Sequence, residues 1–577
     1  MMGKVVSAVS TALLVGAMLV APARAEAQSR VRNPDFGPNV TVVDPSMRGD
    51  RIQATLDSAF KRQEASEFGS ARIAFLFKPG HYDVDAHVGF YTQISGLGLS
   101  PDDVVINGGV RADAKWRKGN ATLNFWRVVE NMAVVPAGGV NQWAVSQAAP
   151  MRRMHIRGDL VLDDGGWSSG GFLADSKVDG QVRSGSQQQW LTRNSELGSW
   201  AGSNWNMVFV GTTNAPATSF PSPPYTTVDS TPVVREKPFL YVDARGEWKV
   251  FVPALRANAR GTTWSAGAAR GESHSMREFV IVKPGDAGAS MNAALARGKN
   301  LIITPGIYHL RAPLHVTRAR TIVLGLGLAT LVADSGATAL IVDDVDGATI
   351  AGLLIDAGST ESPLLMRVGA PGSPRRHARN PTLLSDVFFR IGGAGVAKAV
   401  TSLEINGNDV IADHMWLWRA DHGKEVGWTS NTAATGLVVR GNDVTAYGLF
   451  VEHYQRDQVA WLGDGGRTYF FQNEMPYDVP SQAEWMDGAT RGFSAYRVGA
   501  NVTRHEAWGL GSYCFFNRNP SVVAEHAFAA PVAPGVRFHD MVTVSLGGGK
   551  GTIAHAINDE GAAATAGAIT QKLVSGP

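Results

Sequence analysis

The feature that most constrains the fold is a segment that occurs twice in the chain. Residues 71–100 contain "ARIAFLFKPGHYDV" followed by "ISGLGLSPD", and residues 298–330 contain "GKNLIITPGIYHL" followed by "VLGLGLAT". In both copies an apolar run leads into Pro-Gly-x-Tyr, and Gly-Leu-Gly-Leu follows further along. An internal repeat of this kind indicates two structural units of one fold. We therefore expect at least two domains, in agreement with a length of 577 residues.

Short apolar runs rich in β-branched residues fill the rest of the chain, separated by Gly, Asn and Asp. Examples are "ALIVDDVDGATIAGLLIDAG" and "GLVVRGNDVTAYGLFVEH". Strands at this spacing, without intervening helical stretches, are typical of a parallel β-helix or a β-sandwich. A sandwich would need many tight hairpin signals, and few are present. The pattern therefore favours an all-β chain built of parallel β-helices.

A short helical pattern precedes each copy of the repeat, with apolar residues four positions apart at 52–60 and at 291–295. Such a helix would cover the open end of a coil of strands, whose edge otherwise invites pairing. We predict two tandem right-handed parallel β-helices, each with a short N-terminal capping helix. The expected domains are 26–260 and 277–577, joined by a linker at 261–276 that is rich in Gly, Ala and Ser.

The first 25 residues have the pattern of an export signal. Lys4 precedes an apolar run at 5–20, and Ala23-Arg24-Ala25 is a small-x-small cleavage site. The apolar run is shorter than the roughly 20 residues that span a bilayer, although an uncleaved anchor is the alternative. We expect residues 1–25 to be removed near Ala25 and the mature protein to be secreted or periplasmic. The single cysteine, Cys514, cannot form an internal disulfide and is expected to be a buried small hydrophobe.

Composition and motifs argue against several classes of partner. The net charge is +2 with 18% charged residues, which gives no reason to expect nucleic acid or an anionic surface as partner. No Cys/His spacing for zinc is present, and the acidic run at 343–347 lacks the regular Asp spacing of a calcium loop. The glycine-rich repeats do not follow the dinucleotide-binding pattern. We expect no metal and no cofactor.

The stretch with the clearest chemistry is "TYFFQNEMPYD" at 468–478, a β-forming run that ends in polar residues and a Pro-Tyr pair. It contains Glu474, and Glu452 lies 22 residues earlier, about one rung of such a coil. Residues one rung apart stack at about 4.8 Å, so one of two outward carboxylates would keep its proton to higher pH. A protonated carboxyl near neutrality is what a glycosidase needs to protonate a leaving oxygen. The alternative is that both residues only satisfy backbone groups at turns.

Several nearby groups are suited to the hydroxyl edges and C–H faces of sugar rings. Around the two acids these are His453, Gln472 and Tyr477. A stretch of the first domain, "SGSQQQWLTRNSELGSWAGSNWN" at 184–206, supplies amides, hydroxyls and an indole: Gln187, Gln188, Gln189, Ser199, Trp200 and Ser203. The stretch "WLWRADHG" supplies Asp421 and His422 beside two tryptophans. A glutamine packing ladder for the first stretch, and a buried Arg419–Asp421 ion pair for the second, are the structural alternatives.

With these motifs the chain resembles glycoside hydrolase family 55, the exo-β-1,3-glucanases or laminarinases. The resemblance covers nearly the whole mature chain and rests on the duplicated Pro-Gly-x-Tyr segments and on four stretches: "SGSQQQWLTRNSELGSWAGSNWNMVFVG", "LWRADHG", "FVEHYQ" and "FFQNEMPYD". It implies two tandem β-helices of the pectin-lyase-like fold with a pocket between them. It also implies an inverting reaction whose nucleophilic water is held by polar groups of the first domain, with Gln187–Gln189, Ser199 and Ser203 as candidates.

The family pattern of Glu-His followed one rung later by Gln-x-Glu-x-Pro-Tyr matches Glu452-His453 and residues 472–477. By this resemblance Glu474 is expected to be the general acid. Glu452 is expected to tune that acid or to bind the sugar at subsite −1, because inverting carboxylates lie about 6.5–9.5 Å apart and one rung is too short for a base. The sequence departs from the family at Asn473 and Met475, where small hydroxyl residues are expected, and long insertions are missing. Another β-linked or modified glycan is therefore the alternative to β-1,3-glucan as substrate.

We therefore predict a secreted, monomeric glycoside hydrolase that cleaves β-1,3-glucan by an inverting, exo-acting mechanism. A polysaccharide lyase is one alternative, but lyases need cations around a uronate carboxylate, and only Arg456 and Arg467 lie near Glu474 in sequence. A non-catalytic carbohydrate-binding β-helix is the other alternative, and it predicts binding without turnover. The expected partner is a polysaccharide or oligosaccharide, with no nucleic acid and no membrane after signal cleavage.

Overall fold

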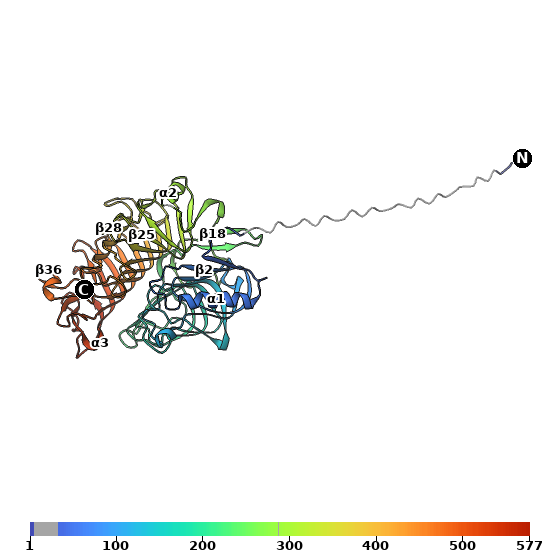
Figure 1. The fold of residues 1–577 in the computed structure, drawn as a ribbon. Helices are drawn as coiled ribbons and strands as arrows, with labels where there is room; N and C mark the ends of the chain where they lie inside the picture. The colour runs from blue at the N-terminus through green and yellow to red at the C-terminus, as the bar shows by residue number, and fades with distance from the viewer. Residues whose placement is uncertain (5–32, 287) are drawn as a thin grey trace. The chain divides into compact units, whose positions relative to one another are not determined.

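The computed structural model of the protein describes residues 1–4, 33–286 and 288–577. The chain forms two compact units, Met1–Asn33 and Pro34–Pro577, and every element discussed below belongs to the second (Figure 1). Apart from its first four residues, the predicted signal peptide with its cleavage site at Ala25 lies outside the described residues. None of the described helices is long and apolar enough to cross a membrane.

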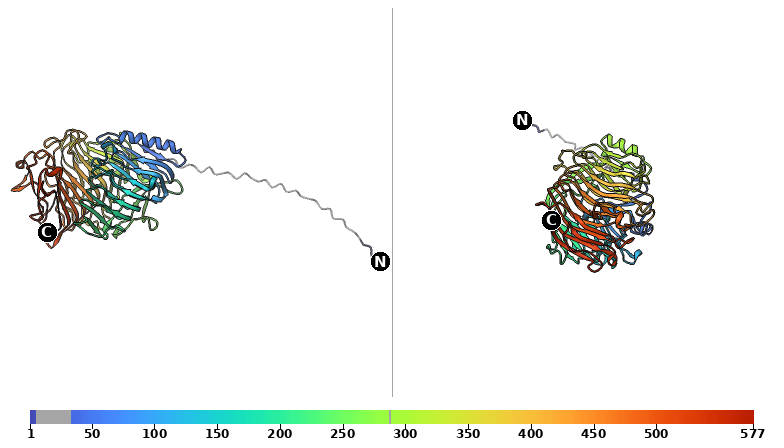
Figure 2. Two further views of the ribbon diagram at one scale, coloured as in Figure 1. Left: turned by 90° about the horizontal axis from the view of Figure 1, so that it is seen from below. Right: turned by 90° about the vertical axis from the view of Figure 1, so that its left-hand side faces the viewer.

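A first parallel coil runs from β1 to β15, and the views of Figure 2 show its strands stacked side by side. Its main sheet has nine strands in chain order: β1 (Val40–Val43), β2 (Ile73–Phe77), β4 (Thr92–Gly96), β6 (Arg127–Pro136), β8 (Met151–Ile156), β10 (Phe172–Ala174), β12 (Gln189–Arg193), β14 (Asn206–Val210) and β15 (Tyr225–Val228). Six further strands pair beside it: β3 (Gly80–His87), β5 (Val104–Arg111), β7 (Val140–Gln142), β9 (Asp159–Val161), β11 (Lys177–Arg183) and β13 (Glu196–Ala201).

A second parallel coil contains two long sheets. The first follows β21 (Phe279–Val282), β22 (Asn300–Ile303), β25 (Ile322–Ala333), β27 (Thr349–Ala357), β29 (Leu383–Ile391), β31 (Ile411–Arg419), β33 (Thr445–Glu452), β35 (Gly466–Glu474), β39 (Arg504–Cys514) and β41 (Gly535–Ser545); β23 (Ile307–Leu310) pairs beside it, and antiparallel β43 (Thr570–Gly576) ends it. The second contains β24 (Leu314–Val316), β26 (Leu340–Val342), β28 (Ser362–Val368), β30 (Ala399–Ile405), β32 (Ala433–Val439), β34 (Val459–Trp461), β38 (Tyr496–Val498), β40 (Val523–Ala529) and β42 (Thr552–Ile557). The tandem parallel β-helix prediction is confirmed.

Antiparallel strands link the two coils. β16 (Thr231–Val234) pairs with β19 (Arg256–Ala259), and β18 (Trp248–Pro253) pairs with both β17 (Phe239–Val242) and β20 (Gly271–Ser275). The segment predicted as a linker, 261–276, thus contains a paired strand. The domain boundaries at 260 and 277 stay a prediction.

One helix precedes each coil, and its apolar residues join the core of that coil. α1 (Gly49–Gln63) buries Ile52, Leu56 and Ala59, and α2 (Gly288–Ala296) buries Met291 and Leu295. The four-residue spacing read from the sequence corresponds to this buried stripe. Cys514 is free and buried, as predicted.

Successive strands of the second coil bend at the same position. A residue with left-handed φ interrupts the pairing of each strand: Asp386 in β29, His414 in β31, Gly448 in β33, Phe470 in β35 and Gly509 in β39, with φ between 52° and 73°. Only glycine adopts this conformation without steric cost, so the non-glycine members depend on their surroundings to hold it. The bends divide each strand into two straight halves.

A buried ionic network joins the two coils. From the first coil, Arg152 Nη1 lies 2.8 Å and Arg193 Nη2 lies 2.9 Å from Oδ2 of Asp413 on β31. Arg193 Nη1 also pairs with Glu236 Oε1 at 2.7 Å, and Arg152 Nη2 pairs with Asp386 Oδ1 at 2.8 Å. These charges are fully desolvated, so each depends on its partners. The network fixes how one coil docks against the other.

Candidate active site

A cavity of about 240 Å³ lies between the two coils and contains the predicted acid pair. The first coil and its loops contribute Thr122, Leu123, Phe125, Gln147, Ser169 and Gln188. The second coil contributes Trp416, Trp418, Asp421, His422, Glu452, His453, Glu474, Tyr477 and Leu546. Because ligand pockets usually measure about 300–1,000 Å³, this one is small.

The pairing of parallel strands brings Glu452 and Glu474 to neighbouring rungs of the second coil. Trp418 pairs with Glu452 on the neighbouring strands β31 and β33, and Glu474 pairs with Tyr513 on β35 and β39. Glu452 and Glu474 end β33 and β35, two residues beyond the paired Phe450 and Gln472. The chain stays paired past them, since the His453 amide donates to the Glu474 carbonyl at 2.8 Å. The sequence prediction that the two glutamates are one rung apart therefore agrees with this register.

Glu452 is a buried carboxylate, 2% exposed, that accepts a hydrogen bond at each oxygen. Trp416 Nε1 donates to Oε2 at 2.7 Å, and Gln147 Nε2 of the first coil donates to Oε1 at 3.2 Å. Burial raises the pKa of Glu452 well above its usual value, and the charge of Glu474 raises it further, whereas the two N–H donors act in the opposite direction.

Glu474 lies beside a histidine and a tyrosine. Its side chain is 13% exposed, and its Oε2 accepts a hydrogen bond from the Tyr477 hydroxyl and lies 3.7 Å from His453 Nε2. His453 Nδ1 donates to the Met475 carbonyl at 3.1 Å, which orients the ring toward Glu474. Burial raises the pKa of Glu474, while His453 and Tyr477 partly oppose that shift. The two glutamates are a coupled pair that holds a proton at higher pH than an ordinary glutamate does.

A second charged group flanks the pair. His422 Nδ1 lies 2.9 Å from Asp421 Oδ1, and His422 Nε2 bonds to Glu67, which belongs to the first coil. Burial raises the pKa of Asp421, but His453 and His422 outweigh it and lower the pKa to about 2. Burial lowers the pKa of His422, but its two carboxylate partners outweigh that effect and raise the pKa to about 10. This charged bridge spans the two coils at one side of the cavity.

Aromatic rings form the wall next to the acids. Trp416 and Trp418 stack with centroids 4.8 Å apart and an interplanar angle of 20°. Phe125 of the first coil packs against Trp416 at 4.8 Å, and Phe68 stacks on Trp418 at 6.2 Å. Indole faces beside carboxylates and amides can contact both the C–H face and the hydroxyl edges of a sugar ring.

Three predicted amides lie outside the cavity lining: Gln187 contacts only the first coil, whereas Gln189 and Gln472 make contacts between the coils. Gln187 is buried and donates to the carbonyls of Val145 and Leu162 at 2.8 and 2.7 Å. Gln189 accepts from the Tyr513 hydroxyl, and Gln472 donates to the Ser169 carbonyl. For Gln187 this is the packing alternative considered above, since both of its amide N–H groups are used by the backbone.

Three further predicted residues lie on the outer strand β13 or just beyond it, and none lines the cavity. Ser199 is exposed, and the Trp200 indole N–H donates to the Gly202 carbonyl at 2.9 Å while its ring packs on Phe209. Ser203 is half-buried in the turn that follows. The Arg419–Asp421 pair considered for the second stretch is wrong, because Arg419 pairs with Asp478 at 2.7 Å and Asp421 faces the two histidines.

Two glutamines line the cavity: Gln147, which the sequence did not single out, and Gln188, which belongs to the predicted Gln187–Gln189 stretch. Gln147 has a left-handed φ of 34° and holds Glu452. Gln188, the middle residue of the Gln187–Gln189 run, lines the cavity while its two neighbours do not. The side-chain Oε1 of each is buried and accepts no hydrogen bond from any described residue. Within the described ranges no group of three or more His, Cys, Asp or Glu side chains could hold a metal ion.

Comparison with known proteins identifies relatives of this chain over most of its length. An exo-beta-1,3-glucanase from Streptomyces sp. (strain SirexAA-E / ActE) is 55% identical to this chain over 540 residues, which is 93% of this chain and 89% of that protein. The chain belongs to glycoside hydrolase family 55. A family profile described as the LAM55 pectate lyase-like domain matches residues 279–474, which end at the predicted acid.

Solved structures of family 55 agree in fold. The structure of sacteLam55A from Streptomyces sp. SirexAA-E matches with a TM-score of 0.93 and 54% identity, and covers 94% of this chain and 99% of that one. A variant of sacteLam55A in complex with glucose matches with the same TM-score, identity and coverage. The resemblance to family 55 read from the sequence is thereby confirmed.

Proposed function

We propose that this chain hydrolyses β-1,3-glucan from a chain end, with Glu474 as the general acid. The observation that carries the proposal is a pair of buried glutamates on neighbouring rungs of a small cavity walled by aromatic rings. Burial and the proximity of the two carboxyls raise the pKa of the pair, which favours the protonated state that a glycosidase acid needs. The similarity to an exo-beta-1,3-glucanase over most of the chain indicates the substrate class.

The hydrogen bonds of the two glutamates support a general acid role for Glu474. Both oxygens of Glu452 accept N–H donors, from Trp416 and Gln147, and such bonds favour the ionised form. Among the described residues, Glu474 accepts a hydrogen bond from the Tyr477 hydroxyl alone, and it is the more exposed of the two. The proton therefore favours Glu474, from which it passes to the glycosidic oxygen as the bond to the anomeric carbon breaks. Burial and the neighbouring charge of Glu474 also raise the pKa of Glu452, so the two carboxyls share one proton, and Glu474, the more exposed of the two, is placed to deliver it.

The attacking water is held by the first coil. Gln147 and Gln188 each present a buried carbonyl oxygen without a donor to the cavity. An unsatisfied buried acceptor in a polar cavity is a suitable partner for an ordered water. Because these amides belong to the coil opposite Glu474, the water attacks the anomeric carbon from the face away from the leaving group, which inverts the anomeric centre. As its bond to that carbon forms, the water releases one proton to solvent water, and Glu474 regains a proton from solvent after the product leaves.

Exo action fits the closed geometry. The cavity is about 240 Å³, below the usual range for ligand pockets. The His422–Glu67 bridge and the Phe68–Trp418 stack connect the coils beside it. A terminal sugar fits such a pocket more readily than the middle of a chain. Export by the N-terminal signal, ending near Ala25, would bring the enzyme to polysaccharide outside the cytoplasm.

The test is reducing-sugar release from laminarin by the wild type and by Glu474→Gln. Loss of the acid should lower kcat by about 10²- to 10⁴-fold, with the fold retained by circular dichroism. The exposed Glu506 on β39 offers a control, since Glu506→Gln makes the same change outside the cavity and should keep full activity. Turnover by Glu474→Gln at the wild-type rate would reject the role of the acid, and no release by the wild type would reject the substrate.

The stereochemical course has a separate readout. Proton NMR of the first product formed should detect the α-anomer from a β-linked substrate. A β-anomer as first product would contradict inversion and would leave the identity of the acid untouched.

A further inference from the structure

Gln147 of the first coil holds Glu452 from a backbone position that needs outside support. Its φ is 34°, and a residue other than glycine keeps a left-handed backbone only where its surroundings fix it. Two donors bind its carbonyl oxygen: the Ala149 amide at 2.9 Å and Nε2 of His414 at 3.0 Å. Since His414 lies on β31, a residue of the second coil fixes this turn of the first coil.

Both ring nitrogens of His414 face oxygen atoms that only accept hydrogen bonds. Nε2 lies 3.0 Å from the Gln147 carbonyl oxygen, and Nδ1 lies 2.9 Å from Asp386 Oδ1. Burial raises the pKa of Asp386, but Arg152 and His414 outweigh it and lower that pKa, so the Asp386 carboxyl is ionised. The two bonds form together only when each nitrogen carries a proton, so His414 is the positively charged imidazolium.

Aromatic rings enclose this imidazolium, which is fully buried. Phe172 stacks on it with centroids 4.4 Å apart and an interplanar angle of 8°, while Phe388 and Phe450 meet it edge-on at 5.3 and 5.9 Å. An aromatic face beside a desolvated cation adds attraction. The cage holds the ring in the orientation that reaches Gln147.

Strand β31 thereby acts on both oxygens of Glu452. Trp416, two residues after His414, donates directly to Oε2 at 2.7 Å. His414 acts on Oε1 through Gln147, whose Nε2 donates to that oxygen at 3.2 Å. The direct and the indirect contact start from neighbouring positions of one strand.

We propose that His414 is a positioning residue of the reaction and that it acts through Gln147. By fixing the Gln147 carbonyl, it keeps the amide N–H of that side chain on Glu452 and the free Oε1 on the attacking water. His414 itself does not line the cavity. The inference rests on the proposed function, in which Gln147 holds that water.

His414→Asn tests the inference in laminarin hydrolysis. Asparagine tolerates a left-handed backbone, but its shorter amide does not reach the Gln147 carbonyl. We expect kcat to fall by about 10- to 100-fold, because the water is misplaced, and KM to stay within about twofold, because the rings of the cavity are untouched. His414→Gln places an amide nitrogen near the position of Nε2 and should restore most of kcat.

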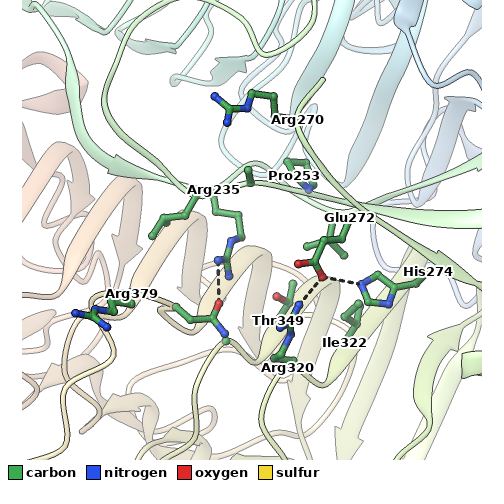
Figure 3. Close-up of a pocket in the computed structure, with 15 residues that line it drawn as sticks. Arg235, Pro253, Arg270, Glu272, His274, Arg320, Ile322, Thr349 and Arg379 are labelled. Carbon is green, nitrogen blue, oxygen red and sulfur yellow. Dashed lines mark hydrogen bonds and ion pairs between the residues drawn. The ribbon is translucent and has the colours of Figure 1, made fainter. Parts of the chain in front are cut away.

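His274 provides a control outside the acid cavity. It lines a second cavity, about 580 Å³, where β20 faces the second coil, and this cavity shares no lining residue with the first (Figure 3). Like His414 it faces carboxylates, since its nitrogens lie 2.9 Å from Glu278 Oε2 and 3.9 Å from Glu272 Oε2. His274→Asn should leave kcat and KM unchanged.

A double-mutant cycle separates action through Gln147 from any other role of His414. Gln147→Gly removes the side chain and suits the left-handed backbone. In that background His414→Asn should lower kcat no further. Losses that multiply in the double variant would overturn the inference, and so would equal losses in His414→Asn and His414→Gln.

A crystal structure of His414→Asn tests the same step without turnover. It should show the Gln147 amide displaced from Glu452 Oε1. A Gln147 side chain that keeps its place would overturn the inference even where the wild type hydrolyses laminarin. A displaced Gln147 in a protein whose wild type releases no sugar would support the contact to His414 and reject only the proposed function.

Discussion

Glu452→Gln offers the sharpest test of the coupling between the two acids. In the wild type, loss of the Glu474 proton creates a second negative charge one rung, or about 4.8 Å, from Glu452. At an effective dielectric constant of about 20, this repulsion is about 3.5 kcal/mol. This repulsion adds to burial in raising the pKa of the pair. Partial exposure of Glu474 screens the two charges, so the change in the variant should be smaller than the full repulsion would give.

The variant removes that repulsion, so the pKa of Glu474 falls. Activity requires protonated Glu474 and is lost as pH rises through its pKa, so the basic limb of kcat/KM against pH should move to lower pH. The assay is laminarin hydrolysis between pH 3 and 9, with thermal unfolding measured at each pH to separate denaturation from titration. Glu506→Gln is the matched control and should leave the limb in place. A limb that stays or moves to higher pH in Glu452→Gln would refute the coupling.

Three further predictions address the charges and rings around the site. Asp413→Asn leaves two buried arginines without their shared carboxylate, so it should lower the free energy of unfolding by about 3–5 kcal/mol in urea titration. Asp464→Asn, in a solvent-exposed ion pair, should lower it by less than about 1 kcal/mol. Equal losses in the two variants would contradict the argument from burial. The pKa of His422 is raised to about 10 in the folded protein, so the charged imidazole stabilises the fold. This contribution is fully present below the unfolded-state pKa of about 6.5 and is lost as pH rises through 10. His422→Gln should thus destabilise more at pH 6 than at pH 10.5 in chemical denaturation, and a pH-independent difference would count against it. Trp418→Ala should lower kcat/KM for laminari-oligosaccharides by about tenfold through lost ring contact, and an unchanged value would remove Trp418 from the sugar site.

Much of the fold, and the pairing of the two cavity glutamates, could be predicted because both depend on repeats within the sequence. The duplicated Pro-Gly-x-Tyr segments predicted two coils, and the spacing of Glu452 and Glu474 predicted neighbouring rungs. In a parallel coil the contact between rungs is set by the number of residues per turn, which the sequence contains.

The rest of the site depends on how the coils dock, which no local pattern encodes. Of three successive glutamines, only Gln188 lines the cavity, because Gln187 binds carbonyls of the first coil and Gln189 contacts Tyr513 of the second coil. Gln147 reaches Glu452 from a left-handed backbone position that its sequence context did not indicate. Ser199 was predicted as a site residue because it follows the glutamine run in sequence, but it lies on the outer strand β13.

The aligned bends of the second coil have a consequence for changing this enzyme. Trp418, Glu452, Glu474 and Tyr513 each follow the left-handed residue of their strand by the same number of positions. A side chain transferred to the equivalent position of the next strand moves by about 4.8 Å along the axis, and one moved two positions along its strand shifts by about 6.6 Å across the sheet. The separation of the two carboxylates can therefore be changed only in these discrete steps, and an intermediate separation requires a longer or shorter side chain.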